Sequence, residues 1–256
     1  MAYRNKIFCS TVYQNGMICS TPGTLNLMNE ATPGRGHDSG RQRHGPLSGR
    51  QAEAARNDQR ILDSARAVFV HDPGAPITAV AKHAGVGISA LYTRYGSKEE
   101  LLRKLCTDGL LIVVAETEAA IKQVENGLGH WQVFADFMRC LTDADTSSMT
   151  LALAGKFAPT PEMFALANRA SELMSEFFAL VRDALRPDLV LHDASLTFEL
   201  VAAIKLASPE RTAELRHRYL TLILDGMRAT GRGELPGPPP AWQELSDRWS
   251  PANHAG

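Results

Sequence analysis

The feature that most limits the fold of this chain is a pair of very short helical patterns on either side of a glycine. The first pattern covers about residues 77–84 and the second about residues 88–95. Gly85 follows the first pattern at the C′ position, where a positive φ is common. Helices this short are not stable alone, so their packing on each other and on a larger core must hold them. The residues expected to face inward are Val80, Ala81, Ala84, Leu91 and Tyr95.

Longer helical patterns lie before and after this pair. The preceding one has an apolar stripe at helical spacing, formed by Ile61, Leu62, Ala65, Val68 and Phe69. The following one is expected to begin after Ser97 as N-cap, with Glu100 in the capping-box position. Three helices with a glycine turn between the second and third are typical of a helix-turn-helix, whose third helix enters the DNA major groove. Helix–glycine–helix turns also occur in ordinary bundles, so the spacing alone leaves that alternative open.

Charge is unevenly distributed along the chain, although the total is only −1. Residues 41–105 hold 11 Lys/Arg against 6 Asp/Glu, whereas residues 106–256 hold 13 against 20. A basic segment joined to an acidic body favours a protein in which one part binds a polyanion. Chance variation along an ordinary surface is the alternative reading of the charge alone.

The remainder of the chain predicts an all-α protein. Helical patterns cover about residues 98–126, 130–143, 147–157, 162–185, 190–206 and 209–229. We expect four regions: a disordered N-terminal extension (1–50), a helix-turn-helix domain (51–100), a helical domain (101–230) and a proline-rich tail (231–256).

One segment resembles a known family of regulators. The sequence "RILDSARAVFV…PITAVAKHAGVGISALYTRYGSKEELL" is similar to the N-terminal domain of the TetR (tetracycline-repressor) family of bacterial regulators, over about residues 57–105. The rest of the chain is similar to that family only in size and helical content. The resemblance implies an N-terminal three-helix helix-turn-helix DNA-binding domain, followed by a C-terminal helical bundle for ligand binding and dimerisation.

The resemblance also implies DNA-contacting residues. Tyr92 and Lys98 would bind backbone phosphates, Lys98 with help from a helix N-terminus. Ala90 and Ile88 stand where the family commonly has Thr and a polar or basic residue. An Ile offers only apolar contact, for example to a thymine methyl group, which shifts sequence reading towards other positions of the same helix. The full expected set is Thr78, Ile88, Ser89, Ala90, Tyr92, Thr93, Arg94 and Lys98.

Two further sites follow from the resemblance, for a ligand and for a second copy of the chain. Aromatic and Met side chains of the body are candidates to line an apolar pocket: Trp131, Phe134, Met138, Phe157, Phe164 and Phe177. Apolar stripes on the last two helices are candidates for a dimer interface, with Leu200, Ile204, Tyr219, Leu222 and Ile223. Ordinary packing within one subunit accounts for any single pocket candidate at least equally well, and it accounts for the apolar stripes nearly as well.

The function expected from these observations is that of a ligand-responsive, homodimeric repressor. It would bind a palindromic double-stranded DNA operator through residues 88–95 and leave it when a small apolar effector binds. A ligand-independent repressor or an activator of the same fold is the alternative, and a helical enzyme or a protein-interaction module is a distant one. No H-E-x-x-H, G-x-S-x-G or phosphate-binding glycine motif occurs, so we expect neither an enzyme nor a cofactor. Scattered cysteines and the lack of a long apolar run predict a soluble cytoplasmic protein.

Overall fold

The computed structural model describes residues 49–153, 156–229, 233–241 and 243–244. Within these ranges the chain forms nine α-helices and one 3-10 turn, and the only β-type pairing is an isolated bridge between Leu185 and Arg228. The all-α prediction is therefore confirmed. Nearly all of the predicted N-terminal extension (1–50) and much of the predicted tail (231–256) lie outside the described residues. The contacts divide the chain between residues 55 and 56, and the following description of packing applies to the described residues from 56 onward.

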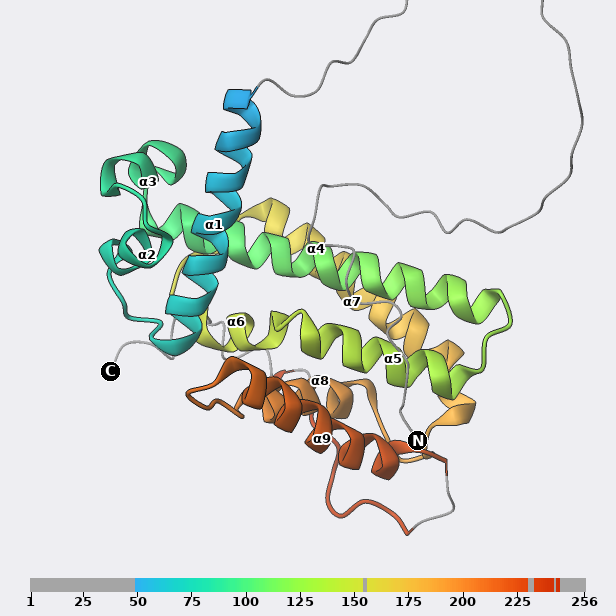
Figure 1. Ribbon diagram of the computed structural model, residues 1–256. Helices are drawn as coiled ribbons and strands as arrows, with labels where there is room; N and C mark the ends of the chain where they lie inside the picture. The colour runs from blue at the N-terminus through green and yellow to red at the C-terminus, as the bar shows by residue number, and fades with distance from the viewer. Residues whose placement is uncertain (1–48, 154–155, 230–232, 242, 245–256) are drawn as a thin grey trace, which may run out of the picture. The chain divides into compact units, whose positions relative to one another are not determined.

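The helices follow the predicted order closely (Figure 1). Their bounds are α1 Gly49–His71, α2 Ile77–Ala84, α3 Ile88–Tyr95, α4 Lys98–Glu125, α5 His130–Asp143, α6 Thr146–Leu153, α7 Pro161–Leu180, η1 Arg182–Ala184, α8 Leu191–Ala202 and α9 Pro209–Met227. The largest differences are at helix ends: α6 and α8 stop about four residues before their predicted ends, and the predicted 162–185 helix finishes as the 3-10 turn η1.

Side-chain caps define the starts of three helices. The hydroxyl oxygens of Ser97, Thr160 and Ser208 each accept a hydrogen bond from the backbone N–H three residues later, at 3.1, 3.3 and 3.2 Å. In α7 and α9 a proline occupies the first helical position, where its missing N–H removes no helical bond. All three starts lie within one residue of the predicted ranges.

The first of two hydrophobic cores is formed by residues of α1, α2, α3 and the first turns of α4. Its helix-turn-helix part is Ile61, Leu62, Ala65, Phe69, Ala75, Ile77, Val80, Ala81, Ala84, Leu91, Tyr95, Leu101, Leu102 and Leu105. Met149 and Leu153 of α6, Phe157 in the connection to α7, and Met163 of α7 belong to the same core. The small helices are thus mounted on a core that α6 and the start of α7 complete.

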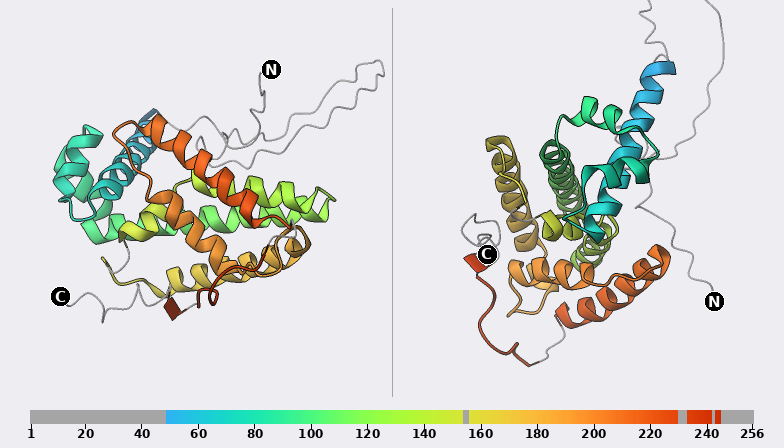
Figure 2. Two further views of the ribbon diagram at one scale, coloured as in Figure 1. Left: turned by 90° about the horizontal axis from the view of Figure 1, so that it is seen from below. Right: turned by 90° about the vertical axis from the view of Figure 1, so that its left-hand side faces the viewer.

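The second core joins the later part of α4 to α5, α7, α8 and α9. Helix α9 packs on α5 and α8, and Figure 2 shows α8 and α9 lying beside each other. Helix α4 contributes to both cores, through Leu101 and Leu105 in the first and Ala120 and Ile121 in the second. No helix among the described residues is long and apolar enough to cross a membrane.

Candidate nucleic-acid interface

The turn between α2 and α3 is built around Gly85. This residue has φ 66° and ψ 32°, the left-handed conformation expected from its C′ position. Its N–H donates to the carbonyl of Lys82 (3.3 Å), and the N–H of Val86 donates to the carbonyl of Ala81 (3.0 Å). This pair of bonds is a Schellman motif, which satisfies the last carbonyls of α2 and sends the chain abruptly into α3.

Helix α3 is held from one side by two buried residues. Leu91 is fully buried and Tyr95 is 7% exposed, as their predicted inward positions require. The opposite face carries the exposed side chains Ser89, Ala90, Tyr92, Thr93 and Arg94, with Tyr92 47% exposed. The hydroxyl of Thr93 donates to the carbonyl of Ser89 at 2.8 Å, which leaves its oxygen able to accept. Hydroxyl, phenol and guanidinium groups on one short helix suit contacts to phosphates and base edges.

Ile88 differs from the outward position predicted for it. Its side chain is only partly exposed and packs against the first core, because it stands one turn from Leu91 at the start of α3. Thr78, in the first turn of α2, is exposed as expected, and so is Lys82 in the last turn of the same helix. Exposed polar groups therefore continue from α3 onto α2.

Arg94 is held by an ion pair that the sequence analysis did not foresee. Its Nε donates to Oδ1 of Asp58 in α1 at 2.8 Å, and its Nη2 donates to Oδ2 of the same carboxylate. The hydroxyl of Tyr95 also donates to Asp58 Oδ1, at 2.7 Å. The hydrogen bonds from Arg94 hold the pKa of Asp58 below its usual value, and burial raises the pKa of Tyr95. A signal for this contact exists in the sequence, because Asp58 continues the inward stripe of α1 three residues before Ile61.

Lys98, at the first position of α4, is used inside the domain. Its ammonium donates to the carbonyls of Ala75 (2.6 Å), Gly74 (3.4 Å) and Pro73 (3.5 Å), all in the connection between α1 and α2. It also lies 5.1 Å from the ring centre of Phe69. Lys98 thus fastens this connection to the start of α4, and a phosphate would bind it only in place of one of these carbonyls.

The six pocket candidates of the body do not converge on one site. Phe134, Met138 and Phe177 lie buried together in the second core, and Trp131 packs against them, with its ring 6.1 Å from that of Phe134. Phe157 lies instead in the first core, beneath the helix-turn-helix. Phe164 is 57% exposed on α7. A linear pattern of aromatic residues does not show which core each helix face joins.

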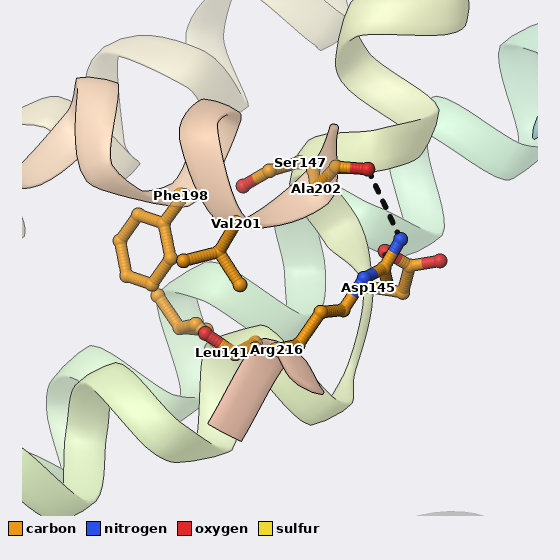
Figure 3. A pocket seen from close by; sticks show the side chains of 8 residues that line it. Leu141, Asp145, Ser147, Phe198, Val201, Ala202 and Arg216 are labelled. Atoms are coloured by element: carbon orange, nitrogen blue, oxygen red, sulfur yellow. Dashed lines mark hydrogen bonds and ion pairs between the residues drawn. The ribbon is translucent and has the colours of Figure 1, made fainter. Parts of the chain in front are cut away.

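One small pocket lies at the junction of α5, α6, α8 and α9, and none of the predicted pocket residues lines it. Its volume is about 10 Å³, far below the 300–1,000 Å³ typical of ligand pockets. Figure 3 shows the Arg216 side chain reaching across it, with Nη2 donating to the carbonyl of Ala202 (3.1 Å). Nη1 donates to the carboxylate of Asp145 (2.7 Å), a residue with φ 51°. Arg216 fills and closes this junction. Among the described residues no cluster of acidic, His or Cys side chains is suited to a metal ion.

The candidate interface residues of α8 and α9 are mostly exposed. Leu200 is 66% exposed, Leu222 59% and Tyr219 49%. Ile204 is partly buried, and Ile223 packs on the second core. Three large apolar side chains thus face outward from two neighbouring helices.

Comparison with known families identifies the helix-turn-helix. Residues 61–105 match the family described as bacterial regulatory proteins, tetR family. The match extends from α1 to the first turns of α4 and so includes the whole recognition unit, which confirms the resemblance seen in the sequence. A family of regulatory proteins also agrees with the expectation that the chain is not an enzyme. No curated protein sequence matches the chain.

Several solved structures are similar to this chain at low identity. A TetR transcriptional regulator from Streptomyces coelicolor is 23% identical, with 68% of this chain and 99% of that one covered and a TM-score of 0.45. LfrR from Mycobacterium smegmatis, in complex with proflavine, is 20% identical, with 71% of this chain and 99% of that one covered and a TM-score of 0.49. PfmR from Thermus thermophilus is 22% identical, with 69% of this chain and 98% of that one covered and a TM-score of 0.48. All three TM-scores lie below 0.5, and no function follows from these similarities.

Proposed function

We propose that this chain, whose residues 61–105 match the tetR family of bacterial regulatory proteins, regulates transcription by binding double-stranded DNA through the exposed face of α3. The observation that carries the proposal is the polar outer face of α3, mounted on the buried Leu91 and Tyr95. A helix placed in this way presents its outer side chains to a major groove while its inner ones fix its orientation.

Each exposed residue has a role suited to its chemistry. The phenol of Tyr92 donates to a backbone phosphate, and the hydroxyls of Ser89 and Thr93 contact base edges or neighbouring phosphates. The methyl of Ala90 and the exposed part of Ile88 offer apolar contact to thymine methyl groups. Thr78 reaches the groove edge from α2, Lys98 contributes positive charge at the start of α4, and Arg94 presents its remaining donors beside Tyr92.

The regulator acts as a homodimer in this proposal. A single helix of eight residues reads few base pairs, whereas two copies related by a two-fold axis read two half-sites about 34–36 Å apart. Leu200, Tyr219 and Leu222, together with Ile204 and Ile223, would pack against the same residues of the second copy and form a four-helix interface. The exposure of Leu200, Tyr219 and Leu222 in one chain supports this assignment, because an interface would remove three large apolar side chains from water.

DNA binding responds to a small apolar effector in this proposal. The effector enters the second core near Trp131, Phe134, Met138 and Phe177 by displacing side chains that now pack together. Because α4 belongs to both cores, a shift of its later turns moves the helix-turn-helix. A coupling of about 1–3 kcal/mol is the usual size for such a link.

A second link joins the body to α1. Lys205, just after α8, donates to the carbonyl of Val70 in the last turn of α1 at 2.9 Å. A change at α8 and α9 therefore reaches the helix-turn-helix without passing through α4.

The test is selection of duplexes from a random-sequence pool, followed by fluorescence anisotropy over a salt series. The proposal predicts selection of a palindrome and a logarithm of affinity that falls linearly with the logarithm of salt, by about 0.9 per phosphate contacted. Selection of no sequence, together with weak and equal affinity for all duplexes, would contradict it. Selection of a single asymmetric half-site would contradict the dimer alone.

A ligand-independent repressor or activator of the same fold is the second candidate. The close packing of Phe134, Met138 and Phe177 in the described core favours it, since an effector must first open that core. A screen of apolar compounds by melting temperature separates the two candidates, because a ligand that binds only the folded state raises that temperature. A compound that raises the melting temperature and weakens operator binding supports the ligand-responsive form.

A further inference from the structure

A carboxylate lies against the face of α3 that is expected to meet DNA. Asp58 belongs to α1 and is 36 residues from Arg94 in the chain, yet its two oxygens accept hydrogen bonds from Nε and Nη2 of that guanidinium. The phenol of Tyr95 donates to the same carboxylate from the buried side (2.7 Å). Asp58 is thus fixed by two partners, and its negative charge is next to the cation that α3 carries on its outer face.

The pair leaves Arg94 partly available. A guanidinium has five N–H donors, of which Asp58 takes two, so three remain. The Arg94 side chain is 60% exposed, whereas that of Asp58 is 22% exposed. The donors left over have solvent access, but the carboxylate behind them cancels most of the charge that a distant phosphate would experience.

Stability alone gives little reason for this pair. Exposed ion pairs typically contribute little to folding, and α3 is already anchored by the fully buried Leu91. For DNA binding the same pair matters more. Each cation that neutralises a phosphate releases condensed counterions and steepens the salt dependence by about 0.9, irrespective of sequence. An arginine paired with a carboxylate contributes little to this counterion release and salt dependence.

We propose that Asp58 is a positioning residue for DNA specificity that acts through Arg94. It masks the charge of Arg94 against non-specific phosphate binding and fixes the guanidinium so that its free donors bind only where a base edge or phosphate of the correct sequence lies in line. This inference rests on the proposed DNA-binding function. It adds that the selectivity of α3 depends on an acidic residue of α1 that touches no DNA.

The experiment compares the full chain with Asp58→Asn on the selected duplex and on a scrambled duplex, by anisotropy over a salt series. Asparagine keeps the shape of the side chain and an oxygen for the Tyr95 hydroxyl but removes the charge. At about 50 mM salt, affinity for the scrambled duplex is expected to rise on the order of tenfold, and its salt slope to steepen by about 0.9. Affinity for the selected duplex rises less, so the specificity ratio falls.

Two further variants separate masking from a purely structural role. Tyr95→Phe removes the other hydrogen bond to Asp58 without changing charge, and is expected to leave both salt slopes unchanged. Arg94→Gln is expected to weaken binding to the selected duplex while the slope for scrambled DNA stays as in the unmodified protein. In the Asp58→Asn background, Arg94→Gln is expected to remove the affinity for scrambled DNA that Asp58→Asn gains.

The outcomes distinguish this inference from the function on which it rests. An unchanged scrambled-DNA slope in Asp58→Asn, or a gain that persists in the double variant, overturns the masking role while DNA binding stands. A salt slope for scrambled DNA that is smaller by about one in the Arg94→Gln single variant also overturns the masking role. This measurement can be made even if Asp58→Asn does not fold. If the unmodified chain shows no salt-dependent DNA binding at all, the proposed function fails and the inference fails with it.

Discussion

Leu153 provides a sharp test of how the helix-turn-helix is supported. It is the last residue of α6, fully buried, and it lies in the same core as Phe69 and Leu91. Leu153→Ala removes three carbons, worth about 0.8 kcal/mol each, and leaves a cavity, so a loss of about 3 kcal/mol is expected. For a unit of this size each kcal/mol lowers the melting temperature by about 2–4 °C, which gives a fall of about 6–12 °C.

The assay combines thermal unfolding with amide hydrogen exchange of α1, α2 and α3. Faster exchange in these helices is expected for Leu153→Ala, since their core loses a side chain from outside the segment that binds DNA. Leu111→Ala is the matched control, because Leu111 is 50% exposed on α4 and its loss is expected to change stability by less than about 0.5 kcal/mol. If exchange in α1–α3 is the same in both variants, α6 does not support the DNA-binding helices in the way described.

Two other predictions concern the turn and a histidine. Gly85→Ala places a β-carbon on a residue with left-handed backbone angles, and no atom obstructs that carbon. The free energy of unfolding, measured in urea, should therefore fall by about 1–2 kcal/mol because of backbone strain alone. An unchanged free energy of unfolding would contradict the φ of 66°. The hydrogen bond to Asp143 raises the pKa of His217, so this pair stabilises the fold below the unfolded-state pKa of about 6.5 and ceases to do so as pH rises through the raised folded-state pKa. Asp143→Asn should therefore lower the melting temperature at about pH 5 and leave it unchanged above about pH 9, and an equal loss at both pH values would refute the linkage.

The short-range features of this fold are those that the sequence predicts well. The bounds of α2 and α3 agree with the predicted ranges because Gly85 and Gly96 each stop a helix and Ser97 starts the next one. The starts of α7 and α9 are equally local, since a capping hydroxyl and a proline stand side by side. In each case the residues that determine a helix end lie within four positions of it.

Features that depend on distant segments were not predictable in this way. Phe157 has the same apolar pattern as other candidates of the body, but the packing of α6 and α7 puts it beneath the helix-turn-helix. Helix α8 ends at Ala202, where its last carbonyl and that of Ile204 accept hydrogen bonds from Arg216 of α9. The inward stripe of α1 indicates that Asp58 faces the core, but no local pattern shows that its partner is Arg94 of α3.

The central claim is that the outer face of α3 binds DNA, and Tyr92 tests it most directly. Tyr92→Phe removes one hydroxyl from a side chain that is 47% exposed, so the fold should be unaffected. Loss of a hydrogen bond to a phosphate costs about 1.5–3 kcal/mol, so affinity for the selected duplex should fall about tenfold or more at an unchanged melting temperature. Ser175→Ala, which removes an exposed hydroxyl from α7, should leave that affinity unchanged. Equal affinities of Tyr92→Phe and the unmodified protein, measured by anisotropy on the same duplex, would contradict the account.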